Sequence, residues 1–575
     1  MCAVGYLPLG RSAQLSIVIP STLSRARVAQ WLCAALLLAF LVAGMFDRDP
    51  WKADEPYSVG MVLNFFRGHD LIVPRVAADP FVEKPPLMYW SGALCARLAS
   101  GVLPVFQGAQ IAVLAWLLVA SACVGRLAQR LHGKASFDWL ATMLMLGSFG
   151  AIENVHKLTA DVPQLAGAAL ALAALPRLAR ADASSRLWGL LLGTGAGIAF
   201  LSKGLLVPGV LALTCLAALL LPAYRTRRYA AALAWAVLAV LPWVVIWPAL
   251  LWHASHSLFI EWFWDNNIGR FFGFVHLGGE RKSYLSDLAN LIALTFPAGW
   301  LAIGALVAAS RIESWRRYAV SRPELAVLWG YVVLLVATLA TSSVMRDIYI
   351  LSIFPALGVL GAGVRLPNWL EKTWATLAIV LMSALGLFLW TRWGLQLTGN
   401  GHVAAGPIGT WLPVDYQLAF SPGLVLGALL LLALWIAAIV LRRELGALIL
   451  GFAGLTFVWG TLSTLLLPWV NEARSYRTPF AELREALPRA ALSGAPKACT
   501  GSLGVGDSER AMLDYFIDVR AIQLADFAHA SRGCVLLLLD KADARVTPPA
   551  GWRKIWQGGR AGDHNERFLL MVGQN

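Results

Sequence analysis

The chain contains 575 residues, of which 58% are hydrophobic and 14% are charged, and its formal net charge is +14. A soluble domain carries about 45–50% apolar and about 25% charged residues. This composition therefore excludes a soluble globular protein, and the continuous apolar runs exclude a disordered one. In a soluble protein the basic excess would suggest nucleic-acid binding, whereas in a membrane protein it is typical of arginines on the cytoplasmic side.

Apolar runs follow one another along most of the chain, and a membrane-spanning helix needs roughly 17–25 such residues. The candidate runs are 28–46, 87–105, 107–126, 137–152, 162–178, 187–200, 204–223, 229–252, 288–309, 325–342, 348–365, 374–394, 424–441 and 447–467. Nothing resembles a cleaved signal peptide, and Arg25 and Arg27 precede the first run. We therefore expect an uncleaved anchor with a cytoplasmic N-terminus.

The run 87–105 is predicted not to span the membrane, because Arg97 in its middle is costly on a lipid-facing helix. With this run removed, every later basic cluster falls on the cytoplasmic side, as the positive-inside rule requires. The clusters are Arg126/Arg130/Lys134, Arg177/Arg180/Arg186, Arg225/Arg227/Arg228, Arg316/Arg317/Arg322, Arg365/Lys372 and Arg442/Arg443. We expect 87–102 to be a helix on the outer surface and the chain to be an α-helical polytopic membrane protein with about thirteen spans.

Residues 470–575 are less apolar and include a strand-like run, Cys534–Leu539. We predict a transmembrane domain over 1–469, with long external loops at 47–106 and 253–287, and an external α/β domain over 470–575. Cys499 and Cys534 both fall in this external domain, where an oxidising compartment would permit a disulfide. The sequence leaves the paired and unpaired states equally open.

The first external loop places polar residues just above the membrane. It reads Trp51-Lys-Ala-Asp-Glu-Pro-Tyr57 and later Phe81-Val-Glu-Lys-Pro-Pro-Leu-Met-Tyr-Trp90. Asp54 is either a functional carboxylate or the N-cap of a helix over 55–67. Glu83 and Lys84 form either part of a site or a solvated charge pair.

The other external loops add further candidates, each with a simpler structural interpretation. Asp161 precedes a span and could be its N-cap, and Lys203 could extend its ammonium group toward water. Arg270 lies among aromatic residues that could form an interfacial helix or wall a phosphate-binding cavity. His276 is a lone histidine, which is more often structural than catalytic, and Tyr349 lies at an external helix start.

All these residues converge on one side of the membrane. The sequence has no redox motif, no Walker sequence and no nucleophile elbow there. Carboxylates and cations at an outer lipid surface suit the transfer of a group from a lipid phosphate, because cations bind the phosphate and stabilise its departure.

Two motifs carry a resemblance to a known family. Asp54-Glu55 after the first span and Glu83-Lys-Pro-Pro-Leu-Met-Tyr-Trp90 resemble the protein O-mannosyltransferase superfamily, whose fold is called GT-C. The span count and the external C-terminal domain are most similar to the bacterial aminoarabinose transferases, ArnT. The resemblance implies inverting transfer of 4-amino-4-deoxy-L-arabinose from undecaprenyl phosphate to a lipid A phosphate, which confers resistance to cationic peptides such as polymyxin. It also implies a monomer in the bacterial inner membrane, with the site facing the periplasm.

The resemblance also assigns roles to residues. It implies catalytic roles for Asp54, Asp161 and Lys84, substrate binding by Lys84, Lys203, Arg270, Tyr349 and Tyr57, and a conceivable divalent metal (Zn or Mg) at Glu83 and His276, although no cofactor is required. Many relatives have Arg-Tyr after the Asp-Glu pair, whereas Pro56-Tyr57 follows here, so one cation is missing.

Two alternatives remain open. The protein could be a related polyprenyl-phosphate glycosyltransferase that uses another sugar or a protein hydroxyl acceptor. It could also be a transporter for a lipid-linked substrate, but transporters show repeated halves and charges near the membrane midplane. Here the polar residues cluster on one side and no repeat is visible, which favours an enzyme.

Overall fold

The computed structural model describes residues 25–68, 70–275, 283–343, 346–405, 411–413, 415–492, 500–526, 529–530, 535–541 and 550–573. The predicted metal residue His276 lies outside these ranges. Cys499 and Cys534, between which a disulfide was considered, also lie outside them.

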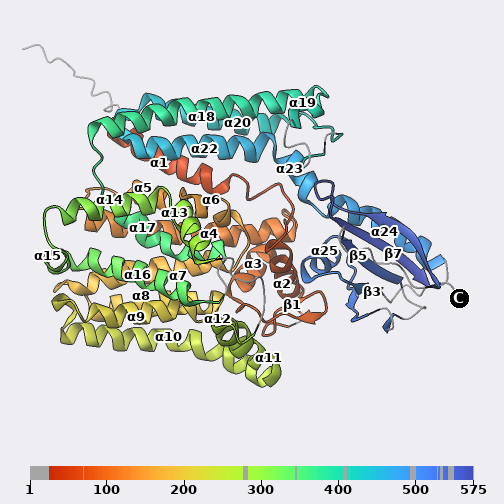
Figure 1. Ribbon diagram of the computed structural model, residues 1–575, viewed down its shortest axis with the longest axis horizontal. Coiled ribbons are helices and arrows are strands. Elements are labelled where there is room, and N and C mark those ends of the chain that lie inside the picture. Colours follow the sequence, from red (N-terminus) through yellow and green to blue (C-terminus); the bar gives the residue numbers. More distant parts are fainter. Residues whose placement is uncertain are drawn as a thin grey trace, which may run out of the picture.

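Helices make up most of the described chain, and many of them are long and apolar (Figure 1). Eight of them could cross a membrane by length and composition, or up to nine if α13 (Tyr284–Leu294) and α14 (Ala298–Ser310), bent by 87°, form one span. The eight are α1 (Arg25–Val42), α4 (Val105–Leu131), α7 (Asp161–Ala174) continuing into η2 (Leu175–Ala179), α10 (Arg227–Ala254), α16 (Pro323–Thr341), α18 (Asn368–Leu397), α20 (Pro422–Val440) and α22 (Ala447–Leu465). The polytopic helical fold class is confirmed, while the count of about thirteen spans stays a prediction.

The remaining helices connect and complete the bundle. They are α2 (Glu55–Arg67), α3 (Leu87–Leu98), α5 (Trp139–Leu146), α6 (Phe149–Ile152), η1 (Asn154–His156), α8 (Ser185–Lys203), α9 (Leu206–Ala218), η3 (Pro222–Tyr224), α11 (His256–Ile260), η4 (Glu261–Gly269), α12 (Arg270–Phe272), α15 (Trp315–Ser321), η5 (Asp347–Ile353), α17 (Phe354–Gly361), α19 (Gly401–Ala405), α21 (Arg442–Leu445) and α23 (Leu467–Arg474).

Helix α7 lies at the centre of the bundle, with 78% of its span buried, whereas only 11% of the α10 span is buried. Helix α8 packs between them. A Cβ atom at Gly193 would lie 2.1 Å from the carbonyl oxygen of Ala236 in α10, and one at Gly195 would lie 2.6 Å from that of Gly167 in α7. These glycines therefore permit close helix packing, as small residues do in membranes.

Helix α3 supports the prediction for the run that carries Arg97. It has 12 residues, and about 20 are needed to cross the hydrocarbon core. The Arg97 guanidinium donates from Nη2 to the carbonyl oxygen of Phe66, 2.7 Å away. The charge thus caps the end of α2 instead of facing lipid tails.

The C-terminal segment forms the expected α/β unit at one end of the bundle (Figure 1). Its strands run in the order β4-β3-β5-β7-β6, parallel among the first three and antiparallel among the last three. The elements are α24 (Arg477–Leu492), β3 (Thr500–Leu503), α25 (Asp507–Ile517), β4 (Ile522–Gln523), β5 (Val535–Lys541), β6 (Trp552–Gly558) and β7 (Glu566–Gly573). Helix α25 packs against α2, so this unit touches the segment 47–106, which also holds the short strands β1 (Arg75–Val76) and β2 (Asp79–Pro80).

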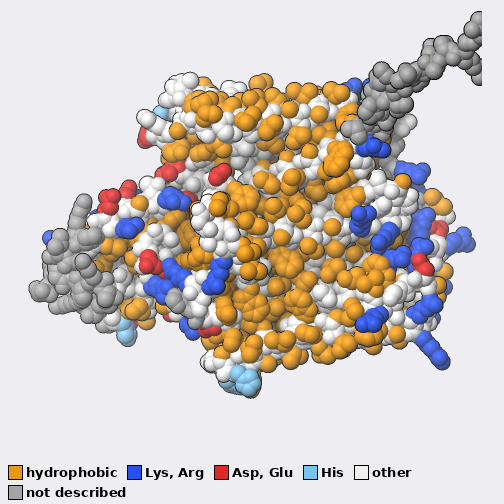
Figure 2. Space-filling model, turned by 180° about the vertical axis from the view of Figure 1, so that it is seen from behind, with side chains coloured by type: hydrophobic (Ala, Val, Ile, Leu, Met, Phe, Trp, Pro, Cys, Tyr) orange, Lys and Arg blue, Asp and Glu red, His pale blue; other side chains and the backbone are white. Residues whose placement is uncertain are grey.

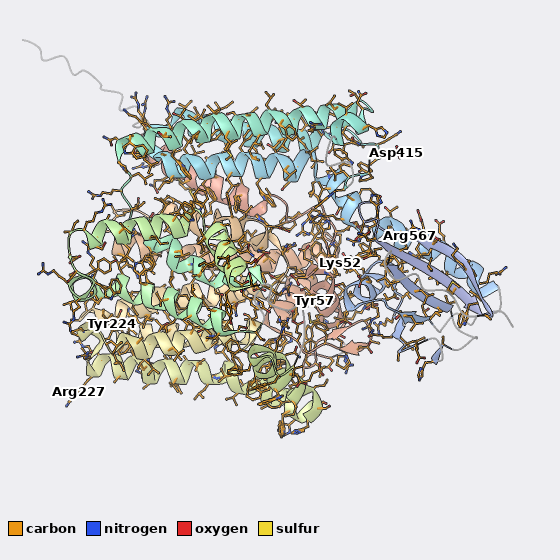
Figure 3. The ribbon with its side chains drawn as sticks, in the orientation of Figure 1. Lys52, Tyr57, Tyr224, Arg227, Asp415 and Arg567 are labelled. Atoms are coloured by element: carbon orange, nitrogen blue, oxygen red, sulfur yellow. The ribbon has the colours of Figure 1, made fainter. Side chains whose placement is uncertain are left out.

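The surface separates into zones that fit a membrane protein. Figure 2 shows apolar side chains over the flank of the bundle, and Lys and Arg gathered at the end far from the C-terminal unit. Figure 3 places Arg227 at that far end and Lys52 and Tyr57 near the C-terminal unit. Charge and apolar surface therefore alternate along the bundle axis, as membrane crossing requires.

Candidate functional site

Asp54 occupies the N-cap position of α2, but its side chain makes no capping hydrogen bond. Its carboxylate instead accepts from Arg346 Nη2, at 2.8 Å and 3.0 Å to the two oxygens, and from the Tyr57 hydroxyl at 2.7 Å. The N-cap interpretation is therefore wrong for the side chain. Burial alone would raise the pKa of Asp54, but the ion pair with Arg346 and the Tyr57 hydrogen bond outweigh it and hold the pKa below its usual value.

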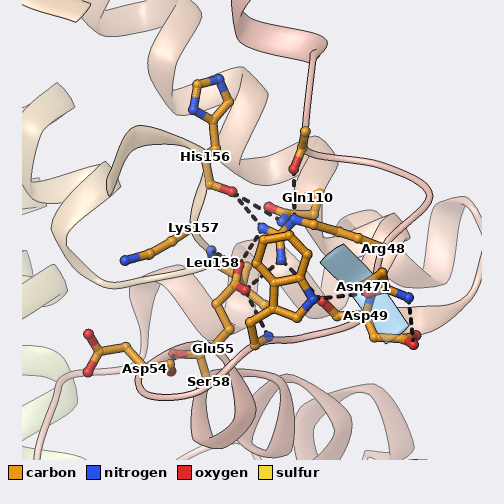
Figure 4. Close-up of polar contacts among 12 residues, drawn as sticks. Arg48, Asp49, Asp54, Glu55, Ser58, Gln110, His156, Lys157, Leu158 and Asn471 are labelled. Carbon is orange, nitrogen blue, oxygen red and sulfur yellow. Dashed lines mark hydrogen bonds and ion pairs between the residues drawn. The ribbon is translucent and has the colours of Figure 1, made fainter. Parts of the chain in front are cut away.

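Glu55, the next residue, is buried and fully engaged in positioning the loop (Figure 4). Its two oxygens accept from Arg48 Nη1 and Nη2 at 2.6 Å and 2.7 Å. They also accept from the backbone N–H groups of Trp51 and Leu158, both at 3.1 Å. Glu55 thus holds the loop around Trp51 against the loop that leads to Asp161.

Asp161 and Lys203 form a buried ion pair between the N-terminal end of α7 and the C-terminal end of α8. Asp161 is the first residue of α7, and Ala160 is the N-cap, so the N-cap interpretation of Asp161 is wrong. The Lys203 ammonium lies 4.2 Å from the centre of the Tyr349 ring. Because its side chain is only 8% exposed, Lys203 does not extend to bulk water.

Glu83 holds two of the predicted phosphate-binding cations. Its Oε1 accepts from Lys84 Nζ at 2.6 Å and from Arg270 Nη1 at 2.7 Å. The Glu83–Lys84 pair is mostly buried, so it is not a solvated charge pair. Burial would raise the pKa of Glu83, but Lys84 and Arg270 outweigh it and lower the pKa to about 2.

The contacts of Glu83 also bear on the metal prediction. Within the described ranges, no group of three or more His, Cys, Asp or Glu residues could hold a metal ion. The Glu83 carboxylate is already paired with two cations, Lys84 and Arg270, whose charges would repel a metal ion. The described donors therefore do not form a metal site, and the pairing with His276 stays a prediction.

Two cavities meet at Lys84 and Lys203, which line both. The smaller cavity is a polar chamber lined by Asp54, Tyr57, Ser58, Lys84, Tyr89, Thr159, Ala160, Asp161, Lys203, Arg346 and Ile348. The larger is a groove of about 510 Å³, which has apolar walls from α9, α12 and α16. Lys84, Lys203, Arg270 and Tyr349 also line this groove. The structure thus brings together every described residue that the sequence singled out, with Glu83 behind two of them.

Arg346 is a chamber residue to which the sequence analysis assigned no role. It follows α16 and reaches Asp54 across 292 positions of sequence. The cation that the Pro56-Tyr57 sequence lacks, compared with the family pattern, is thus supplied beside Asp54 by another loop. The signal available in the sequence was the Arg346-Asp-Ile-Tyr349 stretch.

The C-terminal unit contacts the loop that carries Asp54. Lys52 forms ion pairs with Glu509 and with Glu566, the latter at 2.8 Å. The Ser508 hydroxyl donates to the carbonyl oxygen of Ala53 at 3.1 Å. These contacts lie within two residues of Asp54, so the unit helps to fix the loop that carries it.

One family of known proteins matches part of this chain. Residues 83–252, which include Lys84, Asp161 and Lys203, match the family described as dolichyl-phosphate-mannose-protein mannosyltransferase. Over these residues the match supports the resemblance to the protein O-mannosyltransferase superfamily.

The fold is also that of particular solved proteins. Two crystal structures of ArnT from Cupriavidus metallidurans each cover 95% of this chain and 99% of their own, with a TM-score of 0.64. The structure bound to undecaprenyl phosphate is 17% identical in sequence to this chain, and the apo structure is 19% identical. These matches confirm the GT-C fold. Comparison with curated proteins gives no significant match.

Proposed function

We propose that the protein is a membrane glycosyltransferase that takes a sugar from a polyprenyl-phosphate carrier, and that this sugar is 4-amino-4-deoxy-L-arabinose carried by undecaprenyl phosphate. The acceptor is a phosphate of lipid A, and the site faces the periplasm of a bacterial inner membrane. One observation carries the proposal: an apolar groove ends at Lys84, Lys203 and Arg270, directly beside the chamber of Asp54. Such a groove fits an isoprenoid tail with a phosphate at its end. The similar ArnT from Cupriavidus metallidurans was crystallised with undecaprenyl phosphate.

The cations at the end of the groove suit the departing phosphate. Lys84 and Arg270 share the carboxylate of Glu83, and Lys203 pairs with Asp161, so three cations face two carboxylates. The carboxylates hold the cations in place, and one positive charge is left over for the ligand. As the bond between the sugar and the carrier breaks, charge grows on the phosphate, and prearranged cations stabilise that change.

The environment of Asp54 favours a phosphate acceptor. A carboxylate whose pKa is held below its usual value is ionised at neutral pH and is a weak base. A lipid A phosphate is already anionic and needs no base, whereas a hydroxyl acceptor does. In this proposal Asp54 orients the acceptor or binds the sugar's ammonium group, and direct attack inverts the anomeric centre.

A second candidate has support from the family match. The matching family is described as mannosyltransferases that act on protein, so a protein hydroxyl could be the acceptor of this chain. Asp54 would then act as the general base of the reaction. The two candidates differ in the molecule that gains the sugar.

Mass spectrometry of lipid A from cells with and without this protein tests the proposal. We expect a pentosamine mass increment on phosphate with the wild-type protein and none with Asp54→Asn. The matched control is Asp415→Asn, which changes an exposed external carboxylate and should leave the increment intact. Unmodified lipid A together with glycosylated protein would overturn the leading candidate in favour of the second.

A further inference from the structure

A large cavity lies at the end of the bundle opposite the C-terminal unit. Its volume is about 890 Å³, within the range of about 300–1,000 Å³ that is usual for small-molecule sites. Helices α14 and α16 form its walls, and the chain between α17 and α18 closes one side. Figure 2 shows the Lys and Arg side chains that gather at this end of the molecule.

The lining of this cavity has two chemically different parts. An apolar strip runs along the walls and consists of Ala302, Ala305, Leu306, Ala309, Leu325, Trp329 and Leu360. A basic rim, which we call the arginine rim, consists of Arg130, Arg180, Arg322 and Arg365. The cavity therefore joins an apolar strip to a cluster of guanidinium groups, which are suited to bidentate binding of phosphate.

The arginine rim is only partly neutralised. Glu313 and Glu324 also line the cavity, and each has a carboxylate oxygen 3.9 Å from a rim arginine, Arg322 and Arg180 respectively. Arg180 also lies 3.5 Å from a carboxylate oxygen of Asp182. Arg130 and Arg365 form no ion pair with any residue in the described part of the chain. The Arg130 guanidinium carbon lies 5.5 Å from the centre of the Trp188 ring. Two of the four guanidinium groups are thus available to an anion.

We propose that this cavity binds an anionic glycerophospholipid, with the phosphate diester on the arginine rim and an acyl chain along the apolar strip. A soluble anion would use the rim alone and would leave the strip without a partner. A neutral lipid would leave the arginine charges uncompensated. Basic pockets between helices at the cytoplasmic surface are suited to anionic head groups, and this site is separate from the proposed transfer chamber.

Native mass spectrometry of the full-length protein, released from nanodiscs of phosphatidylglycerol and phosphatidylcholine, tests the inference. We expect the wild type to retain phosphatidylglycerol preferentially. The Arg130→Gln/Arg365→Gln variant should bind it roughly 30-fold more weakly, since each arginine near the surface contributes about fivefold. The control Arg227→Gln/Arg228→Gln removes the same charge from exposed sites at the same end (Figure 3 labels Arg227) and should bind like the wild type.

A second variant keeps the test decisive if loss of the arginines impairs folding. Ala305→Trp fills the apolar strip and leaves all four arginines in place, so it should also lose the retained lipid. An equal loss in the Arg227/Arg228 control would overturn the site, because it would show a general charge effect. Competition by inorganic phosphate alone, with Ala305→Trp unaffected, would overturn the lipid as occupant.

Discussion

The two ends of the helical bundle carry the same kinds of charged side chain but organise them differently. At the end that carries the C-terminal unit, Glu83 accepts from Lys84 and Arg270 at 2.6 Å and 2.7 Å. At the opposite end, the Arg322–Glu313 separation is 3.9 Å. Short ion pairs beside a polar chamber indicate prearranged chemistry, whereas loosely paired arginines indicate a binding surface. Residue type alone does not separate these two roles.

The largest effect should come from removing Lys84, a cation between the groove and the chamber. Lys84→Ala leaves the groove without the lysine that lines both cavities, so transfer should fall by about 10²–10³-fold, as when one charge-stabilising donor is lost. Lys554→Ala, which removes an exposed lysine of β6, should stay close to the wild type. Equal activity of both variants would show that the phosphate binds elsewhere. The rate of sugar transfer from the lipid-linked donor is the readout.

The next effect concerns the free energy of unfolding, to which the buried Arg48–Glu55 pair contributes. Glu55→Gln breaks the buried pair with Arg48 and should lower the free energy of unfolding by about 3–5 kcal/mol, because it leaves a buried charge uncompensated. Glu153→Gln breaks a pair whose glutamate is 63% exposed and should cost less than about 1 kcal/mol. Thermal unfolding in detergent measures both. Similar unfolding temperatures for the two variants would contradict the inference that Glu55 holds the two loops together.

A pH effect should distinguish Arg346 from a structural residue. In the wild type, the Asp54 carboxylate becomes protonated only as the pH falls through its pKa, which lies below the ordinary value of about 3.9. In Arg346→Gln, burial is no longer outweighed by the ion pair, so that pKa rises. The acid limb of the kcat/KM profile should therefore move to higher pH. A lower rate with an unmoved acid limb would mean that Arg346 does not set the charge of Asp54.

The smallest effect should come from the ring over Lys203. Tyr349→Leu removes a cation–π contact of 4.2 Å, which is worth roughly 0.5–2 kcal/mol, and should raise the KM for the donor several-fold. Tyr349→Phe keeps the ring and should change KM little. An equal loss in Tyr349→Phe and Tyr349→Leu would show that the hydroxyl, and not the ring, binds the donor.

Local sequence patterns predicted much of the chamber and the groove. Lys84 and Asp54 were found because each lies in a short motif at a span boundary, and the apolar runs indicated helices. Arg97 likewise marks α3, a helix of 12 residues, as too short and too polar to span, since charge in an apolar run is costly whatever surrounds it. These features depend on neighbours in sequence, which a sequence displays directly.

Features that depend on distant contacts were missed or misjudged. Arg346 meets Asp54 across 292 positions, and nothing local marks that pairing. Asp161 has the position of a helix start, but Lys203 from α8 takes its carboxylate. Glu55 was quoted only as part of the Asp-Glu pair, and its positioning role rests on the buried Arg48 and the backbone of Leu158. Tertiary packing decides each of these cases.

Transfer in a reconstituted system tests the central claim most directly. The purified protein would be mixed with undecaprenyl phosphate carrying labelled 4-amino-4-deoxy-L-arabinose, and with lipid A, and the label on lipid A phosphate would be measured. The account predicts label transfer with inversion at the anomeric carbon by the wild type and its loss in Lys84→Ala. Transfer that Lys84→Ala leaves undiminished, or no transfer from the polyprenyl carrier by the folded wild type, would contradict it.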